Sequence, residues 1–350
     1  MKRILDFFWP LVGLVAVVWS VRLLYQKLAA EAATDAIVRR LLAEGSLWSH
    51  IKVIASVIGR KLSVIPPEAY LFAAISTLVA YAALAWYDRI ALIHLRRERN
   101  ISWMYVSMCS FVTYALSHNI GATVFSGGMV RYRAYTAKGL TATEVAILVA
   151  LCSFTFAFGT ILMFGIVLMS EPQILEPLQT LSPYFAVSRG MAVGIGGALL
   201  AFCALYTLGA WMQFRPLRVR GFELVYPRMP VVIRQYLAGP LELIGAAGII
   251  YFALPAEGNP GFPIVLGAFL LSFSAGLLSQ VPGGVGVMEA VFLAVMPTIP
   301  ATSVFAALLV WRLFYLIIPL AMSIPVILFF ERSQLGRATR DIAPPPGGAH

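Results

Sequence analysis

Long runs without a single charged side chain recur along this sequence, and they constrain its fold more than any other feature. They cover residues 7–21, 69–87, 101–130, 145–170, 190–214, 243–256, 258–288, 290–311 and 313–330. A helix that crosses a bilayer needs about 20 predominantly apolar residues. Only 12% of the 350 residues are charged, against about 25% in soluble proteins. The sequence therefore predicts an all-α polytopic membrane protein with about eight transmembrane helices.

Basic residues gather between the apolar runs and give the chain a formal net charge of +10. Cytoplasmic loops of membrane proteins are enriched in Lys and Arg, so segments 88–100 and 213–236 and the tail 331–350 are predicted to be cytoplasmic. This placement favours membrane phospholipid, with its anionic headgroups, as the partner of the basic residues. Nucleic acid is not expected as a partner.

The opposite side of the membrane is predicted from the segments that carry little positive charge. Segments 171–188 and 255–262 are acidic or neutral and are expected outside. The apolar run 7–21 follows Lys2 and Arg3, lacks a convincing cleavage site and is interpreted as an uncleaved first span. Both termini are then cytoplasmic, in a multi-pass protein of the bacterial inner membrane.

Residues 1–330 are predicted to form one membrane domain, followed by a flexible cytoplasmic tail at 331–350. Within the domain, segment 26–67 is longer than the other connections and has mixed charge. Its apolar residues recur near helical spacing, which predicts amphipathic helices at the outer interface between membrane and water. A solvated loop is the alternative.

Two apolar segments are predicted to enter the membrane and return to the same side. Segments 88–100 and 131–139 are both basic, so the uncharged stretch 101–130 between them must form a hairpin or a broken helix. The same reasoning makes 281–300 a returning segment, and it begins with Pro282 and three nearby glycines. Interrupted apolar segments in both halves of a chain indicate a transport site. An internal pseudo-repeat is therefore expected, although identity between the halves is not visible.

The first candidate site combines glycines, which let a ligand approach the backbone, with arginines, which suit phosphate. It consists of His118, Asn119, Gly127, Gly128, Arg131 and Arg133. We expect the two arginines to bind the phosphate of a lipid headgroup, and the histidine and asparagine to line its path. The alternative is structural: the glycines allow close helix packing, and the arginines extend to the interface.

The second candidate site is a proline- and glycine-rich break followed by an acid, with Gly283, Gly284, Glu289 and Arg312 as its members. A new helix is predicted to start after the glycines, where its dipole favours a negative charge. A carboxylate within an apolar region is costly and indicates function by default. The alternative is that Glu289 simply pairs with an arginine such as Arg312.

Two further acids are interpreted as helix-start carboxylates. Glu144 follows Thr141, a residue type that caps helices, and Glu242 follows Pro240. Arg234 and Arg312 are considered as partners of Glu242.

Motifs of enzymes that act on nucleotides, phosphate esters or peptides are missing from the sequence, including a Walker loop and an H-E-x-x-H pattern. The four histidines are widely scattered, which gives no indication of a metal site. No enzyme activity and no cofactor are therefore expected.

The two candidate sites together resemble the lysylphosphatidylglycerol synthetase transmembrane family, the flippase half of the multiple peptide resistance factor. The resemblance rests on HNIG at 118–121, GGMVRYRAY at 127–135 and PGGVGVME at 282–289, and it extends over nearly the whole chain. Many members have a glycine–acid pair before the arginine of the first motif, where this chain has Gly127, Gly128, Met129 and Val130.

The resemblance implies a helical bundle with about eight spans and re-entrant elements, which translocates aminoacylated or related phospholipids. Bifunctional members add a soluble aminoacyl-transferase domain, which is not expected here. We therefore expect a phospholipid flippase that binds an anionic headgroup in a polar cavity at mid-membrane. A scaffold for a lipid- or envelope-synthesis enzyme and a membrane-embedded lipid-modifying enzyme are the alternatives. Association with such an enzyme and formation of a homo-oligomer are left open.

Overall fold

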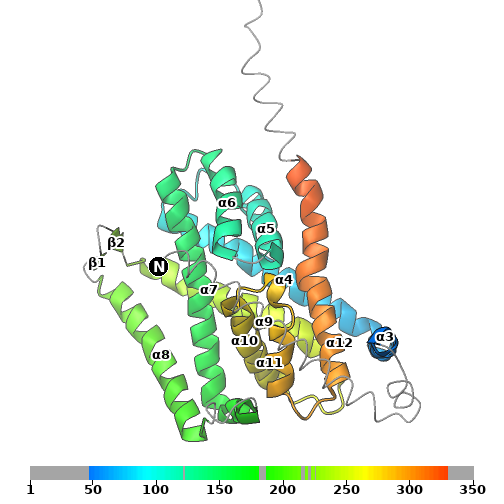
Figure 1. Cartoon of the computed structure of the whole chain (residues 1–350). Coiled ribbons are helices and arrows are strands. Elements are labelled where there is room, and N and C mark those ends of the chain that lie inside the picture. Colours follow the sequence, from blue (N-terminus) through cyan, green and yellow to red (C-terminus); the bar gives the residue numbers. More distant parts are fainter. Residues whose placement is uncertain are drawn as a thin grey trace, which may run out of the picture.

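The computed structural model describes residues 47–120, 123–180, 187–213, 217–219, 222–224 and 226–329, and this part of the chain is almost entirely helical (Figure 1). The α-helices are α3 (Leu47–Val64), α4 (Pro67–His94), α5 (Trp103–Ile120), α6 (Thr123–Thr136), α7 (Ala142–Ser170), α8 (Arg189–Trp211), α9 (Met229–Ala253), α10 (Phe262–Leu278), α11 (Val287–Val295) and α12 (Ala301–Trp311). Shorter elements are the 3₁₀ turns η1 (Pro172–Thr180) and η3 (Pro282–Gly284), the π-helical turn η4 (Arg312–Ile317), and strands β1 (Leu217–Val219) and β2 (Phe222–Leu224).

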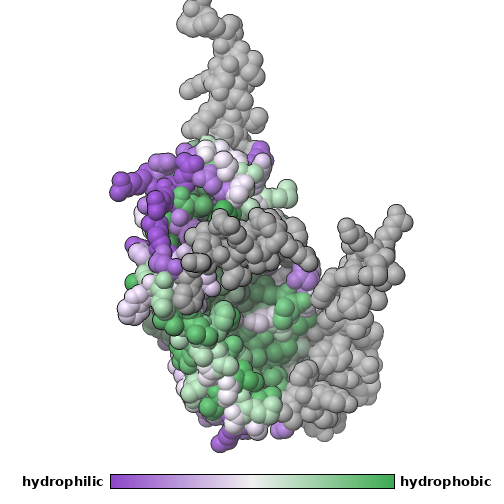
Figure 2. Space-filling view, turned by 90° about the vertical axis from the view of Figure 1, so that its left-hand side faces the viewer, coloured by the Kyte–Doolittle hydropathy of each residue, from purple (hydrophilic) through white to green (hydrophobic). Residues whose placement is uncertain are grey.

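Five of the described helices are long and apolar enough to cross a membrane, which confirms the predicted class of an all-α polytopic membrane protein. They are Pro67–His94, Ala142–Ser170, Arg189–Trp211, Met229–Ala253 and Ala301–Phe329, the last running through η4 without a break. Figure 2 shows hydrophilic side chains gathered at one end of the molecule, with an apolar belt below them. The predicted first span, 7–21, and the tail, 331–350, lie outside the described residues.

Helices α4 and α9 cross the bundle obliquely, whereas α7, α8 and α12 run roughly upright (Figure 1). Small residues allow these crossings. A Cβ atom on Gly245 of α9 would lie 2.8 Å from the backbone nitrogen of Ala80 in α4, and one on Gly159 of α7 would lie 2.6 Å from the Cα atom of Gly239 in α9. Backbone contact at glycine is how membrane helices gain van der Waals packing without a hydrophobic driving force. The core of the molecule lies along α9.

Both predicted returning segments are observed as short helix pairs. Helix α5 leads into α6, which packs beside it, and α10 leads through η3 into α11 in the same manner (Figure 1). The 3₁₀ turn η3 contacts α5, so the two interrupted segments meet inside the bundle. The prediction that the two helix pairs form an internal pseudo-repeat stays a prediction.

The basic connections lie together at one end of the bundle. Arg97 pairs with Glu144 at the start of α7, its Nε lying 2.8 Å from Oε1. Arg228, at the start of α9, donates a hydrogen bond of 3.0 Å to the carbonyl of Ile93 at the end of α4. Strands β1 and β2 form a small antiparallel hairpin within the basic segment 213–236. Their cytoplasmic orientation stays a prediction.

Part of the mixed-charge segment 26–67 is helical. Helix α3 packs on α12, and it is seen end-on in Figure 1, so it runs across the bundle. This arrangement fits the predicted amphipathic helix for 47–64, and the solvated loop is wrong for these residues. Residues 26–46 lie outside the described part of the chain.

Candidate substrate site

The break between α10 and α11 is built from glycines in a backbone conformation that other residues rarely adopt. The φ angles are 60° at Gly283, 61° at Gly284 and 83° at Gly286, and side chains are strained in this left-handed region. There is also little space for a side chain, because a Cβ on Gly284 would lie 3.2 Å from the Cα of Gly276 in α10. The turn therefore requires glycine for both its angles and its packing.

A buried ion pair holds this turn in place. The Glu289 carboxylate accepts a hydrogen bond of 2.7 Å from the N–H of Gly286, at the start of α11. It also accepts one of 2.6 Å from Nε of Arg312, whose Nη1 donates at 2.9 Å to the carbonyl oxygen of Gly283. The predicted structural partnership of Glu289 with Arg312 is confirmed, and Arg312 fixes both the turn and the new helix. Contact of either residue with a ligand stays a prediction.

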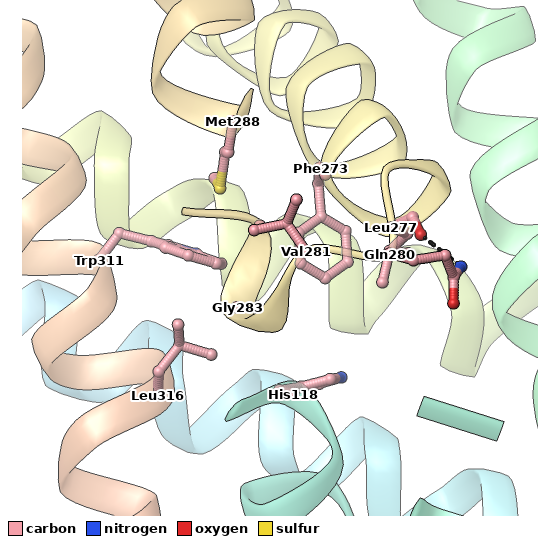
Figure 3. A pocket seen from close by; sticks show the side chains of 11 residues that line it. His118, Phe273, Leu277, Gln280, Val281, Gly283, Met288, Trp311 and Leu316 are labelled. Carbon is pink, nitrogen blue, oxygen red and sulfur yellow. Dashed lines mark hydrogen bonds between the residues drawn. The ribbon is translucent and has the colours of Figure 1, made fainter. Parts of the chain in front are cut away.

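A small, partly open hollow of about 40 Å³ lies beside the turn. Figure 3 shows His118 opposite the turn that carries Gly283. The wall is mostly apolar and comes from α5, α10, η3, α11 and the helix of α12 and η4, through His118, Phe273, Gly276, Leu277, Gln280, Val281, Gly283, Gly284, Met288, Trp311 and Leu316. Three of the predicted site residues, His118, Gly283 and Gly284, thus line one hollow.

Arg131 lies in a separate buried cluster with Asp88. Its Nη2 and Nε donate to the Asp88 carboxylate at 2.7 and 3.1 Å, the Tyr135 hydroxyl donates to it at 2.8 Å, and the Cys152 thiol at 3.3 Å. The guanidinium also lies over the ring of Tyr114, 4.8 Å from its centre. Arg131 is therefore neutralised within the protein, and the hydrogen bonds found for its guanidinium all go to Asp88.

The prediction that placed Asp88 in a cytoplasmic loop is wrong. Helix α4 continues to His94, and Asp88 is fully buried within it. The apolar residues Ile90, Ala91 and Leu92 extend the buried surface beyond Asp88, and Arg131 neutralises the charge. The sequence does contain an indication that the helix continues through Asp88. This acid follows directly after an apolar run, and three apolar residues come shortly after it.

Aromatic rings connect the cluster of Arg131 to the helical turn that also carries Arg312. The His118 ring lies 5.5 Å from the ring of Tyr114, which packs on Arg131, and it stacks at 5.3 Å on the ring of Tyr315 in η4. Arg131 and Glu289 therefore do not share a wall of the hollow, but His118 lies between their clusters. The sequence predicts that Arg131 and Glu289 line the same chamber, but the structure places them in two charged clusters that are joined through aromatic rings.

The remaining predicted residues have packing or surface positions. Asn119 donates a hydrogen bond of 3.1 Å to the carbonyl of Leu316, which ties the end of α5 to η4. Gly127 is buried against α5, where a Cβ would lie 3.2 Å from Cγ2 of Thr113, whereas a Cβ on Gly128 would meet open space. Arg133 is exposed on α6. The structural alternative thus accounts for Gly127.

Glu242 has a different setting from the one predicted. The sequence predicts it at a helix start with an arginine, but it lies in the middle of α9, 1% exposed, because α9 begins at Met229 and continues through Pro240. Its Oε1 accepts a hydrogen bond of 2.5 Å from the Tyr315 hydroxyl. Glu144 does start its helix as predicted, in a capping box with Thr141.

These features define a class of protein: a multi-pass helical membrane protein in which two interrupted segments meet at one internal hollow. Within the described ranges, His, Cys, Asp and Glu side chains form no group of three or more that could hold a metal ion. The sequence matches the family described as the lysylphosphatidylglycerol synthase TM region over residues 46–323. The match covers most of the chain, so the protein belongs to this family.

Among the known proteins that are similar to this chain, two match over most of its length and a third over a part of it. The uncharacterized protein slr0712 of Synechocystis is 31% identical over 75% of this chain and 80% of its own length. The inner membrane protein YbhN of Escherichia coli is 29% identical over 73% of this chain and 77% of its own. A phosphatidylglycerol lysyltransferase of Staphylococcus haemolyticus is 28% identical over 30% of this chain but only 14% of its own length.

Proposed function

We propose that this protein moves a phospholipid across the inner membrane of a bacterium, with the anionic headgroup passing through the hollow between the two interrupted segments. The observation that carries the proposal is the meeting of η3 with α5 at a hollow lined by His118, Gly283 and Gly284. Irregular backbone at membrane depth occurs where it is buried in protein or lines a wet cavity, and in transporters such breaks surround the substrate.

The chemistry of the hollow suits a lipid phosphate. The imidazole of His118 is a donor for phosphate oxygens. The exposed Arg133 on α6 meets headgroups at the surface. The apolar remainder of the wall suits the start of the acyl chains. Phosphatidylglycerol is the anionic lipid proposed as substrate, and its aminoacylated forms share the phosphate, because the family description refers to lysylphosphatidylglycerol and one relative's name to a phosphatidylglycerol lysyltransferase.

The test is lipid translocation in liposomes that contain the purified protein and a fluorescent phosphatidylglycerol. Access of a membrane-impermeant quencher to the labelled headgroups reports how fast lipid leaves the inner leaflet. We expect vesicles with the wild-type protein to translocate lipid clearly faster than empty vesicles. We expect His118→Leu to slow translocation by about tenfold or more, because it replaces a polar group in the wall of the hollow with an apolar one.

A matched control lies at the other end of the bundle. Arg189 pairs with Glu176 at 2.8 Å on the surface, and Arg189→Gln removes one charge without touching the hollow. This variant is expected to translocate lipid as the wild type does. Equal rates for the wild type, His118→Leu and empty vesicles would overturn the proposed function.

A further inference from the structure

Three carboxylates are buried in the described part of the chain, and they differ in whether a cation is paired with them. Asp88 is 0%, Glu242 1% and Glu289 3% exposed. Asp88 pairs with Arg131 and Glu289 with Arg312, whereas no arginine or lysine of the described residues pairs with Glu242. An ionised carboxylate without a countercharge is among the most costly groups to place in an apolar interior. A proton on Glu242 removes this cost.

Two tyrosine hydroxyl groups lie beside the Glu242 carboxyl group, and only one of them is hydrogen-bonded to it. The Tyr315 hydroxyl donates to Oε1 at 2.5 Å, and the Tyr87 hydroxyl lies beside the same carboxyl group. Both Oε2 of Glu242 and the hydroxyl of Tyr87 are buried and lack a hydrogen-bond partner. A carboxylic acid can donate as well as accept, so Oε2 can bond to the Tyr87 hydroxyl in either protonation state, and the absence of a countercharge is what favours the proton.

The surroundings of Glu242 offer no alternative countercharge. The helices α10 and α12, which pack on α9, contain no titratable side chain. Helix α8 contributes Tyr206, but this hydroxyl bonds to Gln235, about two turns away along α9. The titratable groups that face the site directly or through one ring include no lysine, arginine or second carboxylate, and they are Tyr81 and Tyr87 of α4, Tyr114 and His118 of α5, Cys152 of α7 and Tyr315 of η4. The cations Arg131 and Arg312 are paired with Asp88 and Glu289.

The carboxyl group also lies directly behind a wall of the hollow. Tyr315, its hydrogen-bond donor, stacks on His118 at 5.3 Å and on Trp311 at 5.2 Å, and both of these side chains line the hollow (Figure 3). The Tyr81 hydroxyl donates at 3.0 Å to the carbonyl of Tyr315 and holds that residue in place. A charge on Glu242 is therefore felt in the hollow through a single layer of aromatic side chains.

We propose that Glu242 is a proton-binding site that couples entry of an anionic headgroup into the hollow to uptake of a proton. This coupling rests on the proposed function. The proton comes from water in the hollow and forms one O–H bond on the Glu242 carboxyl group, while Tyr315 keeps its own proton. With the two ion pairs neutral, ionised Glu242 leaves one uncompensated negative charge that repels a phosphate, and protonation removes it. Anion and proton therefore bind together, and a proton gradient drives the lipid.

The proton site is tested without transport by infrared difference spectroscopy of the protein in lipid nanodiscs, recorded as the pH is raised. We expect the carbonyl band of a protonated carboxylic acid in the wild type and in Glu144→Gln, and its loss in Glu242→Gln. In Tyr315→Phe the band is expected to persist at a shifted frequency, because one hydrogen bond to the carbonyl is lost. A band unchanged in Glu242→Gln would overturn the proton site, and melting curves of each variant show whether it is folded.

The coupling is tested in the liposome assay with an imposed pH gradient. One proton per anionic lipid gives about a tenfold difference in lipid accumulation for each pH unit. In Glu242→Gln, lipid accumulation should not depend on the pH gradient, and translocation should still be faster than in empty vesicles. A wild type that translocates lipid but ignores the gradient would overturn the coupling and leave the proposed function intact. A wild type equal to empty vesicles would overturn the proposed function, and the infrared measurement would still decide the proton site.

Discussion

Arg312 and Tyr315 lie on one π-helical turn, yet they bind carboxylates on two different helices. Arg312 donates to Glu289 of α11 at 2.6 Å, and Tyr315 donates to Glu242 of α9 at 2.5 Å. π-Helical turns are rare and are frequently found at functional sites. Here the turn connects the residue that fixes the glycine break with the residue that bonds the unpaired acid. A shift of this turn would change both sites together.

The first prediction concerns the geometry of Arg312 and not only its charge. Arg312→Lys keeps a cation but cannot donate at once to the Glu289 carboxylate and to the carbonyl of Gly283, because an ammonium lacks the planar fork of a guanidinium. We expect a loss of about 1.5–3 kcal/mol in the free energy of unfolding, the range for one hydrogen bond to a charged group. Thermal unfolding in detergent measures it, and translocation should fall in parallel.

Arg189→Lys is the matched control, because the same substitution is made in an exposed pair with Glu176. Surface ion pairs contribute little, so no measurable change is expected. Equal stability of Arg312→Lys and the wild type would show that charge alone holds the glycine turn.

The second prediction concerns the buried pair of Asp88 and Arg131. Asp88→Asn leaves the guanidinium buried without a countercharge, and removal of one partner of such a pair costs about 3–5 kcal/mol. A large drop in the unfolding temperature in detergent is expected. Glu176→Gln, which breaks the exposed pair, serves as the control and should melt like the wild type. An Asp88→Asn protein as stable as the wild type would mean that Arg131 finds another partner, as it would in binding a phosphate.

The sequence indicated the spans and the two interrupted segments because these depend on local properties. Apolar length marks a span, and the basic segments on either side of 101–130 require an even number of crossings. The turn at Gly283 was predictable for the same reason, since proline and glycines break a helix wherever they stand. The pairing of Glu289 with Arg312 was also within reach, because each was a lone charge beside an apolar run.

Contacts between distant helices were beyond sequence reasoning. Asp88 and Arg131 are 43 positions apart, and Glu242 and Tyr315 are 73 apart, so only the packing of α4, α6 and α9 brings them together. An acid at the edge of an apolar run resembles a loop residue when its countercharge lies elsewhere. Tyrosine, which bonds Glu242, is apolar enough to be counted as part of a span. The sequence therefore predicts the helices that carry Asp88 and Glu242 but misplaces these two acids.

The third prediction concerns the crossing of α7 and α9. Gly239→Ala places a Cβ 2.8 Å from the Cα of Gly159, a contact that forces the two backbones apart. Overpacking of this kind costs about 1–3 kcal/mol, measured as a lower unfolding temperature in detergent. Gly194→Ala on α8 is the control, because its Cβ would meet no atom within 4 Å. A Gly239→Ala protein that melts at the wild-type temperature would contradict the tight crossing.

The last prediction separates packing from backbone access at two adjacent glycines of α6. A Cβ on Gly127 would press on Thr113 of α5 at 3.2 Å, whereas one on Gly128 would meet nothing within 4 Å. Gly127→Ala should therefore lower both stability and translocation, because it moves α6 off α5 beside the buried pair of Arg131. Gly128→Ala should be neutral or more stable by up to about 1 kcal/mol, since alanine favours a helix more than glycine. If Gly128→Ala instead abolishes lipid translocation while melting like the wild type, a headgroup or a hinge requires the bare backbone there, and the role of this motif is binding and not packing.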